Sequence, residues 1–253
     1  MIRTDTFTVP EHVHGYPGVA FGGYVAGLLA AQSAAAELRV DFRRKVAVDT
    51  PIAVRPTESG GCALIDLDGN VLVEASSSVV TIAPPPAPSW RDALAITEAQ
   101  ATKRRENDCY GCGSACPPGR GLRLFPWAVP ERDRVIAAWT PDPALAAPTG
   151  ELPPEVVWAA LDCPGGWAAG ALRKMRRGSV TAAITATQLA PVWPDHPYIS
   201  YAWPISHEGR KHTVGVALAT PDGTPCALAE ALWIEPRPDS TPDHQLPPHS
   251  NRT

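Results

Sequence analysis

The sequence lacks long hydrophobic runs, a signal segment and a strong excess of charge of either sign. No apolar run reaches the ~18–20 residues that a membrane-spanning helix needs, and the longest, 25–36, contains Gln32 and Ser33. The first residues have no basic segment that leads into an apolar stretch, as a secretory signal would. The net charge is −4 with both signs scattered, which argues against nucleic acid as a partner. We therefore expect a cytoplasmic protein with no membrane partner.

What the sequence does have is the composition of a folded globular protein. It is 44% hydrophobic, and a chain of 253 residues buries roughly 70–75% of its unfolded surface, so it needs no disulfide to build a core. This length fits one large domain or two domains of about 120 residues.

An internal repeat favours two units. The segments 22–29 and 165–172 both read Gly-Gly-aromatic-x-Ala-Gly-x-Leu, at an offset of 143 residues. Two further matches keep the same order with a growing offset: 46–51 with 192–197, and Asp68-Gly69 with Asp222-Gly223. Three matches in the same order indicate a duplicated unit.

Each unit is predicted to contain a buried helix followed by antiparallel strands. Segment 22–38 is rich in Ala and Leu and nearly uncharged, which is typical of a helix buried on most sides. Gly27 within it indicates close packing against a neighbouring element. Asp68-Gly69 and Asp222-Gly223 are hairpin signals. The predicted strands of the first unit are 39–48, 51–57, 62–67 and 71–81. The predicted elements of the second unit are strands 121–125 and 135–139, helices 155–162 and 165–175, and strands 179–189, 198–206, 213–220 and 226–234.

These elements set the predicted domain boundaries. An N-terminal unit covers 1–83, a proline-rich linker with a short helix at 89–105 covers 84–108, and a C-terminal unit covers 109–235. The tail, 236–253, is rich in Pro, Ser, Asp and His and is predicted to be disordered.

Six cysteines fall into two groups. Cys109, Cys112 and Cys116 cluster in the sequence with a spacing that can hold zinc, but no second Cys or His pair at metal spacing accompanies them. A structural turn is therefore favoured over a zinc site, and we predict no metal. The other three, Cys62, Cys163 and Cys226, lie in apolar runs and are predicted to be small buried hydrophobic residues.

Several segments of the chain resemble those of a known protein family. The segment 21–27, Phe-Gly-Gly-Tyr-Val-Ala-Gly, is similar to the N-terminal half of tandem-hotdog acyl-CoA thioesterases. The segments 109–113 and 121–124, Cys-Tyr-Gly-Cys-Gly and Gly-Leu-Arg-Leu, resemble a signature of bacterial thioesterase-like hotdog proteins. Segments 158–167 and 209–211 look like motifs of a largely uncharacterised actinobacterial branch. The resemblance covers about residues 7–235 and implies an α+β double hotdog, with two antiparallel sheets each wrapped around a central helix.

The resemblance also implies an acyl thioester ligand, on acyl-CoA or an acyl carrier, and no cofactor. A helix N-terminus presents free N–H groups and partial positive charge, and glycines there let a carbonyl approach the backbone. Gly22-Gly23 and Gly165-Gly166 are thus candidates to polarise the thioester carbonyl, with Tyr24 and Trp167 beside them. The alternative is that these glycines only make a tight entry to the helix.

Asp162 is the candidate to activate water. It lies in an apolar run three residues before Gly165, where burial can raise a carboxyl pKa into the range of a general base. The alternative is that Asp162 caps its own helix, with Pro164 in the first turn. The first unit has Val19 at the matching position, so a single working site would depend on Asp162. Gln188, polar in an apolar strand, is predicted either to orient water or to pair with a core carbonyl.

Arg210 and Lys211 are the candidates to bind the phosphates of CoA, since Arg offers bidentate pairing. A solvated strand end is the alternative for this pair. His14, eight residues before Gly22, is either a solvated loop residue or folds back to the site.

Three function classes stay open, with thioester hydrolysis in first place. The residues after each Gly-Gly are small or apolar, whereas many hotdog thioesterases carry an acidic residue there. This departure favours a non-catalytic acyl-CoA-binding protein. A hydratase or dehydratase would need a histidine in the second unit, which only His196, His207 or His212 can supply. Whether such a two-unit chain pairs further into a homo-oligomer is also open.

Overall fold

The computed structural model describes residues 6–58, 60–104 and 106–238. The first half of the chain contains β1 (Thr6–Phe7), β2 (His14–Tyr16), β3 (Val19–Ala20), α1 (Gly22–Ala30), β4 (Glu37–Phe42), β5 (Ile52–Pro56), β6 (Cys62–Ile65) and β7 (Val71–Ser77). The second contains α2 (Trp90–Ala99), β8 (Trp127–Val129), β9 (Arg134–Trp139), α3 (Pro154–Ala160), α4 (Cys163–Trp167), β10 (Val180–Gln188), β11 (Tyr198–Glu208), β12 (Lys211–Ala219) and β13 (Pro225–Ile234). Short 3-10 turns lie at 101–103, 130–132 and 143–145.

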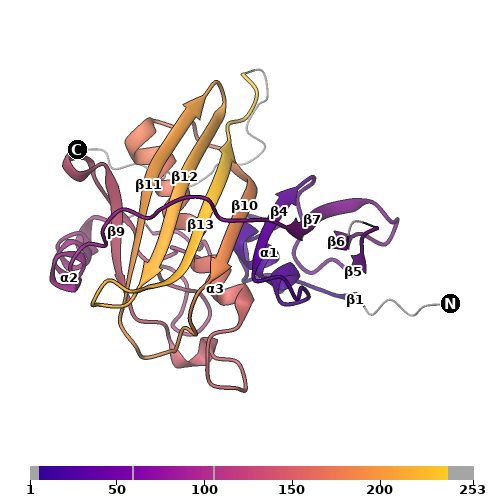
Figure 1. The fold of residues 1–253 in the computed structure, drawn as a ribbon, viewed down its shortest axis with the longest axis horizontal. Helices are drawn as coiled ribbons and strands as arrows, with labels where there is room; N and C mark the ends of the chain where they lie inside the picture. Colours follow the sequence, from indigo (N-terminus) through magenta and orange to yellow (C-terminus); the bar gives the residue numbers. More distant parts are fainter. Residues whose placement is uncertain (1–5, 59, 105, 239–253) are drawn as a thin grey trace.

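One antiparallel sheet of eleven strands joins the two halves, in the order β1-β5-β6-β7-β4-β10-β13-β12-β11-β9-β8. Figure 1 shows the indigo and purple strands of the first half continuing into the orange and yellow strands of the second. The halves meet where β4 pairs with β10, from Asp41 opposite Ala183 to Glu37 opposite Thr187. We call this pairing the seam. The two predicted sheets are therefore edge-to-edge parts of a single sheet.

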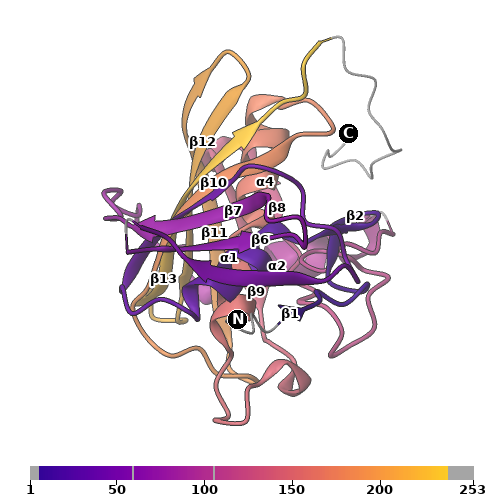
Figure 2. The same cartoon turned by 90° about the vertical axis from the view of Figure 1, so that its right-hand side faces the viewer.

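The strand order is the same outward from the seam in both halves. The first strand after the helix lies at the seam, and the fourth, third and second strands follow it: β4-β7-β6-β5 on one side and β10-β13-β12-β11 on the other. Seen along the sheet in Figure 2, the strands of the first half lie in front of those of the second.

The two faces of the sheet carry different cores. Alternate residues of a strand point to opposite faces, and on β12 the pair Val214 and Val216 belongs to the main core while Ala217 and Ala219 belong to a second cluster. The helices α1, α3 and α4 pack into the main core. The second cluster lies under the proline-rich segment 78–89 and α2, and Pro85 accepts a hydrogen bond from the Tyr201 hydroxyl. The linker thus covers the second half instead of hanging free (Figure 1).

Two glycines allow α1 to lie directly on α3. A Cβ atom on Gly27 would meet the Glu155 Cα at 2.3 Å, and one on Gly23 would meet the Trp158 carbonyl oxygen at 2.7 Å. Both distances are far below van der Waals contact, so only glycine fits at either position. The close packing that Gly27 predicted is confirmed.

Several predicted boundaries are wrong. The first helix ends at Ala30 rather than 38, because 37–42 pairs with strands on both sides and this pairing overrides helix propensity. The second-unit helix, predicted at 165–175, begins at Cys163 and continues from Ala168 to Leu172 as a π-helix. Segment 121–125 is not a strand: Arg123 has a left-handed φ of 49°, and its Nη1 donates to the carbonyls of Ser114 and Cys116.

Within the described ranges, no helix is long and apolar enough to cross a membrane. The predicted disordered tail lies outside the described residues from 239 onward.

We predict that Gly27→Ala destabilises the fold by about 1–3 kcal/mol, because the added methyl overlaps the α3 backbone. Helix propensity alone would give the opposite sign, a gain of about 1 kcal/mol. Urea denaturation of the variant, with the exposed Ala31→Ser as control, measures the difference. An unchanged or raised free energy of unfolding in Gly27→Ala would contradict the packing described here.

Candidate active site

A pocket of about 330 Å³ opens at the seam and is lined by both halves of the chain. Its lining residues include Tyr16, Phe21, Gly22, Val25, Phe42, Arg43, Arg44, Lys45 and Val46 from the first half, and Cys109, Asp162, Cys163, Val180, Thr181, Trp233 and Ile234 from the second. We call it the seam pocket. Because most of the lining is apolar, the few polar groups in it stand out as candidates for chemistry.

Among the described residues that line the pocket, Asp162 is the one with an acidic side chain. Asp162 is 2% exposed, and its Oδ2 accepts a hydrogen bond of 2.7 Å from the Gly23 backbone N–H. Its Oδ1 accepts one of 2.7 Å from the Thr181 hydroxyl. The prediction that Asp162 caps its own helix is wrong, since its side chain makes no such bond to α4. It caps α1, the helix of the other half.

Burial determines how this carboxyl titrates. Removal from water raises the pKa of Asp162 to about 6, although the hydrogen bonds from Thr181 and Gly23 oppose the rise. Each carboxylate oxygen has two lone pairs, so either can accept a further hydrogen bond from water. A carboxylate with this pKa is ionised at neutral pH and is suited to accept a proton.

The N-terminus of α1 provides donors beside the carboxylate. The N–H groups of the first helical turn have no partner within the helix, and Gly22 is its first residue. Gly22 lines the pocket, and a Cβ atom there would lie 3.1 Å from Asp162 Oδ2. The missing side chain leaves the start of the helix open to a bound molecule.

Two aromatic residues of the pocket were not predicted. The half-buried Tyr16 donates its hydroxyl proton to the Ser179 carbonyl at 2.5 Å, and burial raises its pKa. Trp233 is 6% exposed, and its indole N–H has no hydrogen-bond partner among the described residues. Neither residue belongs to the repeat, so no pattern in the sequence marks them.

Three consecutive basic residues lie at the rim. Arg43, Arg44 and Lys45 follow β4, line the pocket and are exposed to solvent. Arg43 pairs with Glu74 at 2.8 Å. This run was not predicted as a binding site, because it lies inside segment 39–48, which was predicted to be strand.

The second Gly-Gly pair has different surroundings. Gly165 and Gly166 are buried against the sheet, where Cβ atoms would meet Val214 at 3.0 Å and the Trp233 ring at 2.7 Å. They do not line the seam pocket. This geometry favours the packing alternative for these glycines.

The remaining predicted site residues lie outside the lining of the pocket. Gln188 donates to the Ala190 carbonyl at 3.2 Å, as its core-carbonyl alternative predicts. The ring of Tyr24 packs edge-on against Tyr110, and Trp167 packs against Trp127. Gly23 reaches the site only through its N–H bond to Asp162.

Arg210 and Lys211 border the site without lining it. Arg210 donates to the Glu235 carbonyl at 2.6 Å, and the exposed Lys211 pairs in register with Ile234, a pocket residue. Among the described residues, no histidine lines the pocket. His14 lies 3.3 Å from Asp108, His196 approaches the Pro194 carbonyl, and His207 stacks on His212.

Known proteins resemble this chain in fold rather than in sequence. No family model and no curated protein matches it. An acyl-CoA thioesterase II of Mycobacterium marinum is similar in structure, with a TM-score of 0.58 and 14% identity over 92% of this chain and 93% of that one. The tesB protein of Mycobacterium avium subsp. paratuberculosis gives 0.55 and 16%, over 93% and 95%. A conserved protein with a hot dog fold from Alicyclobacillus acidocaldarius gives 0.53 and 14%, over 92% and 93%.

These similarities span nearly the whole chain and confirm the fold class. The protein is an α+β double hotdog, as the sequence resemblance implied.

We predict that Asp162 makes the stability of the protein fall as pH rises from about 4 to 6. Its pKa is higher in the folded state than in the unfolded chain, so the folded state binds the proton more tightly in this range and loses that advantage as pH rises through about 6. The rise from 3.8 corresponds to about 3 kcal/mol. Urea unfolding of the wild type and Asp162→Asn from pH 4 to 7 measures it.

The Asn side chain does not titrate. The free energy of unfolding of Asp162→Asn should therefore increase relative to that of the wild type as pH rises from about 4 to 6. If the free energies of unfolding of the two proteins changed in parallel with pH, the pKa of the Asp162 carboxyl would not be raised in the folded state.

Proposed function

We propose that the protein hydrolyses an acyl thioester, with acyl-CoA as the favoured substrate. The observation that carries the proposal is the buried Asp162 carboxylate beside the open N-terminus of α1 in a largely apolar pocket. A thioester needs these features in one place: an acid-base group, a donor for its carbonyl and an apolar surface for its acyl chain. Two of the structural neighbours described above, with overlap over more than nine tenths of both chains, carry thioesterase or tesB names, which supports the choice.

In the proposed reaction, Asp162 deprotonates a water molecule that attacks the thioester carbonyl carbon. The Gly22 N–H donates to the carbonyl oxygen as it gains negative charge, and one such donor is worth about 3 kcal/mol of transition-state stabilisation. When the tetrahedral intermediate collapses, the C–S bond breaks, and the thiolate of the leaving group takes up the proton that Asp162 accepted. The products are a carboxylic acid and a thiol.

The neighbours of Asp162 keep its carboxylate in position for this step. The Gly23 N–H and the Thr181 hydroxyl hold one oxygen each, which fixes the plane of the carboxylate at the seam. Trp233 adds an aromatic ring to the same lining. The first unit has Val19 where the second has Asp162, so we propose one working site, built from both units.

The basic rim suits the phosphates of coenzyme A. Arg43, Arg44 and Lys45 are exposed at the edge of an apolar pocket, so a ligand can place its acyl group inside and its anionic end on the rim. Arginine pairs with phosphate through two parallel N–H donors. Arg210 and Lys211 stay a second candidate pair for the same phosphates, because Lys211 adjoins the lining residue Ile234.

The residues that line the pocket can be compared with what two alternative functions would need. A hydratase or dehydratase needs a histidine near its carboxylate, and no described histidine lines the pocket. A non-catalytic acyl-CoA-binding protein would use the pocket without turnover. The position of the Asp162 carboxylate at a helix N-terminus favours hydrolysis over both.

We further infer that the fold arose by internal duplication, since the strand order is repeated outward from the seam. Three further statements remain predictions: the domain limits given above, a cytoplasmic location and assembly into a homo-oligomer.

We predict that Asp162→Asn lowers kcat/KM for acyl-CoA by about 10²–10⁴, because the general base is lost. In the wild type, kcat/KM should rise about tenfold per pH unit below pH 6 and level off above it, since only the ionised carboxylate accepts a proton. A thiol-trapping assay over a panel of acyl-CoA chain lengths measures both. Thr181→Ser, which keeps the hydroxyl, is the matched control and should retain most of the activity.

Substantial thiol release by Asp162→Asn would contradict the proposed base. Heat stabilisation by acyl-CoA without any thiol release in the wild type would favour the binding protein instead.

We predict that the double variant Arg44→Ala/Lys45→Ala raises KM for acyl-CoA about tenfold or more, because two charge-assisted contacts are lost. KM for the matching acyl-N-acetylcysteamine, which has no phosphate, should stay unchanged. Arg210→Ala/Lys211→Ala is the parallel variant. If that variant alone raises KM for acyl-CoA, the phosphates bind at the β12 strand end and the rim assignment is wrong.

A further inference from the structure

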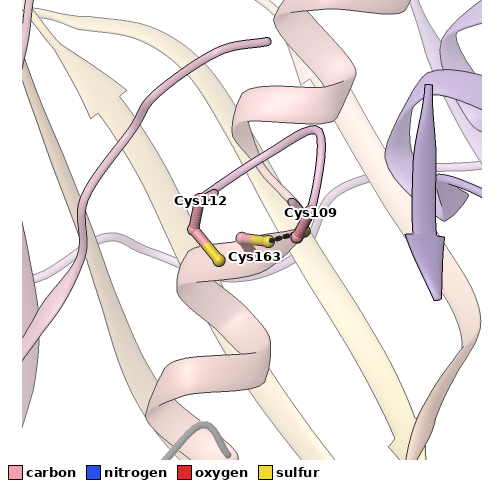
Figure 3. A group of neighbouring side chains, drawn as sticks. All are labelled: Cys109, Cys112 and Cys163. Atoms are coloured by element: carbon pink, nitrogen blue, oxygen red, sulfur yellow. Dashed lines mark hydrogen bonds between the residues drawn. The ribbon is translucent and has the colours of Figure 1, made fainter. Parts of the chain in front are cut away.

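Three cysteines from distant parts of the chain converge beside the seam pocket. The Sγ atoms of Cys109, Cys112 and Cys163 all lie within 4.8 Å of one another, and those of Cys109 and Cys163 are 3.6 Å apart. All three residues are buried. Figure 3 shows Cys109 and Cys112 on a loop above the start of α4, with the three side chains pointing toward one another.

The grouping differs from the one in the sequence. Cys116 follows Cys112 by four residues, but its thiol points away and contacts the carbonyls of Asp108 and Cys109. Its place in the cluster is taken by Cys163, which was predicted to be an isolated hydrophobic residue. A third metal ligand is therefore present where the sequence showed no partner for the Cys109–Cys112 pair.

The local backbone holds the three thiols in this arrangement. The Gly113 N–H donates to the Cys109 carbonyl at 2.7 Å, which closes the turn that carries Cys109 and Cys112. A Cβ atom on Gly111 would lie 2.7 Å from the Cys163 sulfur, so only glycine lets the turn sit this close to α4. The loop after the turn is fixed by the Arg123 bonds to Ser114 and Cys116.

These distances suit a thiophilic cation. Tetrahedral zinc binds thiolate sulfur at about 2.3 Å, which places ligand sulfurs about 3.8 Å apart. The observed separations reach this spacing with sulfur shifts of about 1 Å or less.

The cluster also has an entry path. Cys109 and Cys163 line the seam pocket, whereas Cys112 lies behind them. An ion can reach the three sulfurs from the pocket, and its fourth coordination position would face the same way.

We propose that Cys109, Cys112 and Cys163 bind a zinc ion beside the seam pocket. Zinc is chosen among the soft cations because thiolate ligands in a four-coordinate site with one non-cysteine position are typical of it. Two of the three zinc ligands share the pocket lining with the proposed hydrolytic site, but neither Asp162 nor the rim residues are zinc ligands. It replaces the prediction of no metal.

The test uses the full-length protein, reduced, loaded with zinc and dialysed, with metal measured by elemental mass spectrometry. We expect about one zinc ion per chain in the wild type and in Cys116→Ser, and less than about a tenth of an ion in Cys112→Ser. Cys116→Ser is the matched control because it belongs to the sequence cluster but not to the spatial one. Equal zinc loss in the two variants, or a wild type that keeps less than about a tenth of an ion, would overturn the proposal.

A second measurement needs no variant and covers the case in which Cys112→Ser does not fold. Cobalt(II) added to the wild type in place of zinc should produce thiolate-to-cobalt charge-transfer absorption that saturates at one equivalent and is reversed by zinc. A cobalt spectrum without charge-transfer absorption would show that no thiolate coordinates the metal.

Discussion

The hydrogen bond between the buried Asp162 carboxylate and the Gly23 N–H joins the two halves of the chain at the position where chemistry is proposed. A buried carboxylate is costly unless it is hydrogen-bonded, and here its partners come from the first helix of one half and from β10 of the other. The β4–β10 pairing sets the distance between these elements. The stability of the fold and the proposed catalysis therefore both depend on the hydrogen bond between Asp162 and Gly23. Neither unit contains a complete site.

This arrangement explains why the two Gly-Gly pairs are not equivalent, although the sequence repeats them. Gly22 and Gly23 begin a helix whose end is open to the seam pocket and capped by a carboxylate from the other unit. Gly165 and Gly166 lie against Trp233 and the sheet. If the chain arose by duplication, Asp162 and Val19 occupy equivalent positions, and only Asp162 has an acidic side chain. The two units would then share the same fold but form only one site between them.

Much of the fold could be predicted from the sequence because local patterns decide it. The Gly-Gly segments, the Asp-Gly hairpins and the strand-like runs predicted two similar units, and Gly27 predicted a close helix contact that Glu155 provides. The site could be predicted only in part. Asp162 and Gly23 were singled out, but the hydrogen bond between them depends on long-range strand pairing. Arg43–Lys45, Trp233 and the Cys163 partner of Cys109 become neighbours of the pocket for the same reason, and no spacing in the sequence marks them.

The proposed mechanism requires the thioester carbonyl to bind where the two halves meet. A crystal structure of the protein with a non-hydrolysable acyl-CoA analogue, in which a methylene group replaces the thioester sulfur, tests it most directly. We expect the analogue's carbonyl oxygen within hydrogen-bond distance of the Gly22 N–H, with its carbonyl carbon facing Asp162 and its phosphates on the basic rim. A carbonyl bound at Gly165-Gly166, or an analogue that leaves the seam pocket empty, would contradict it.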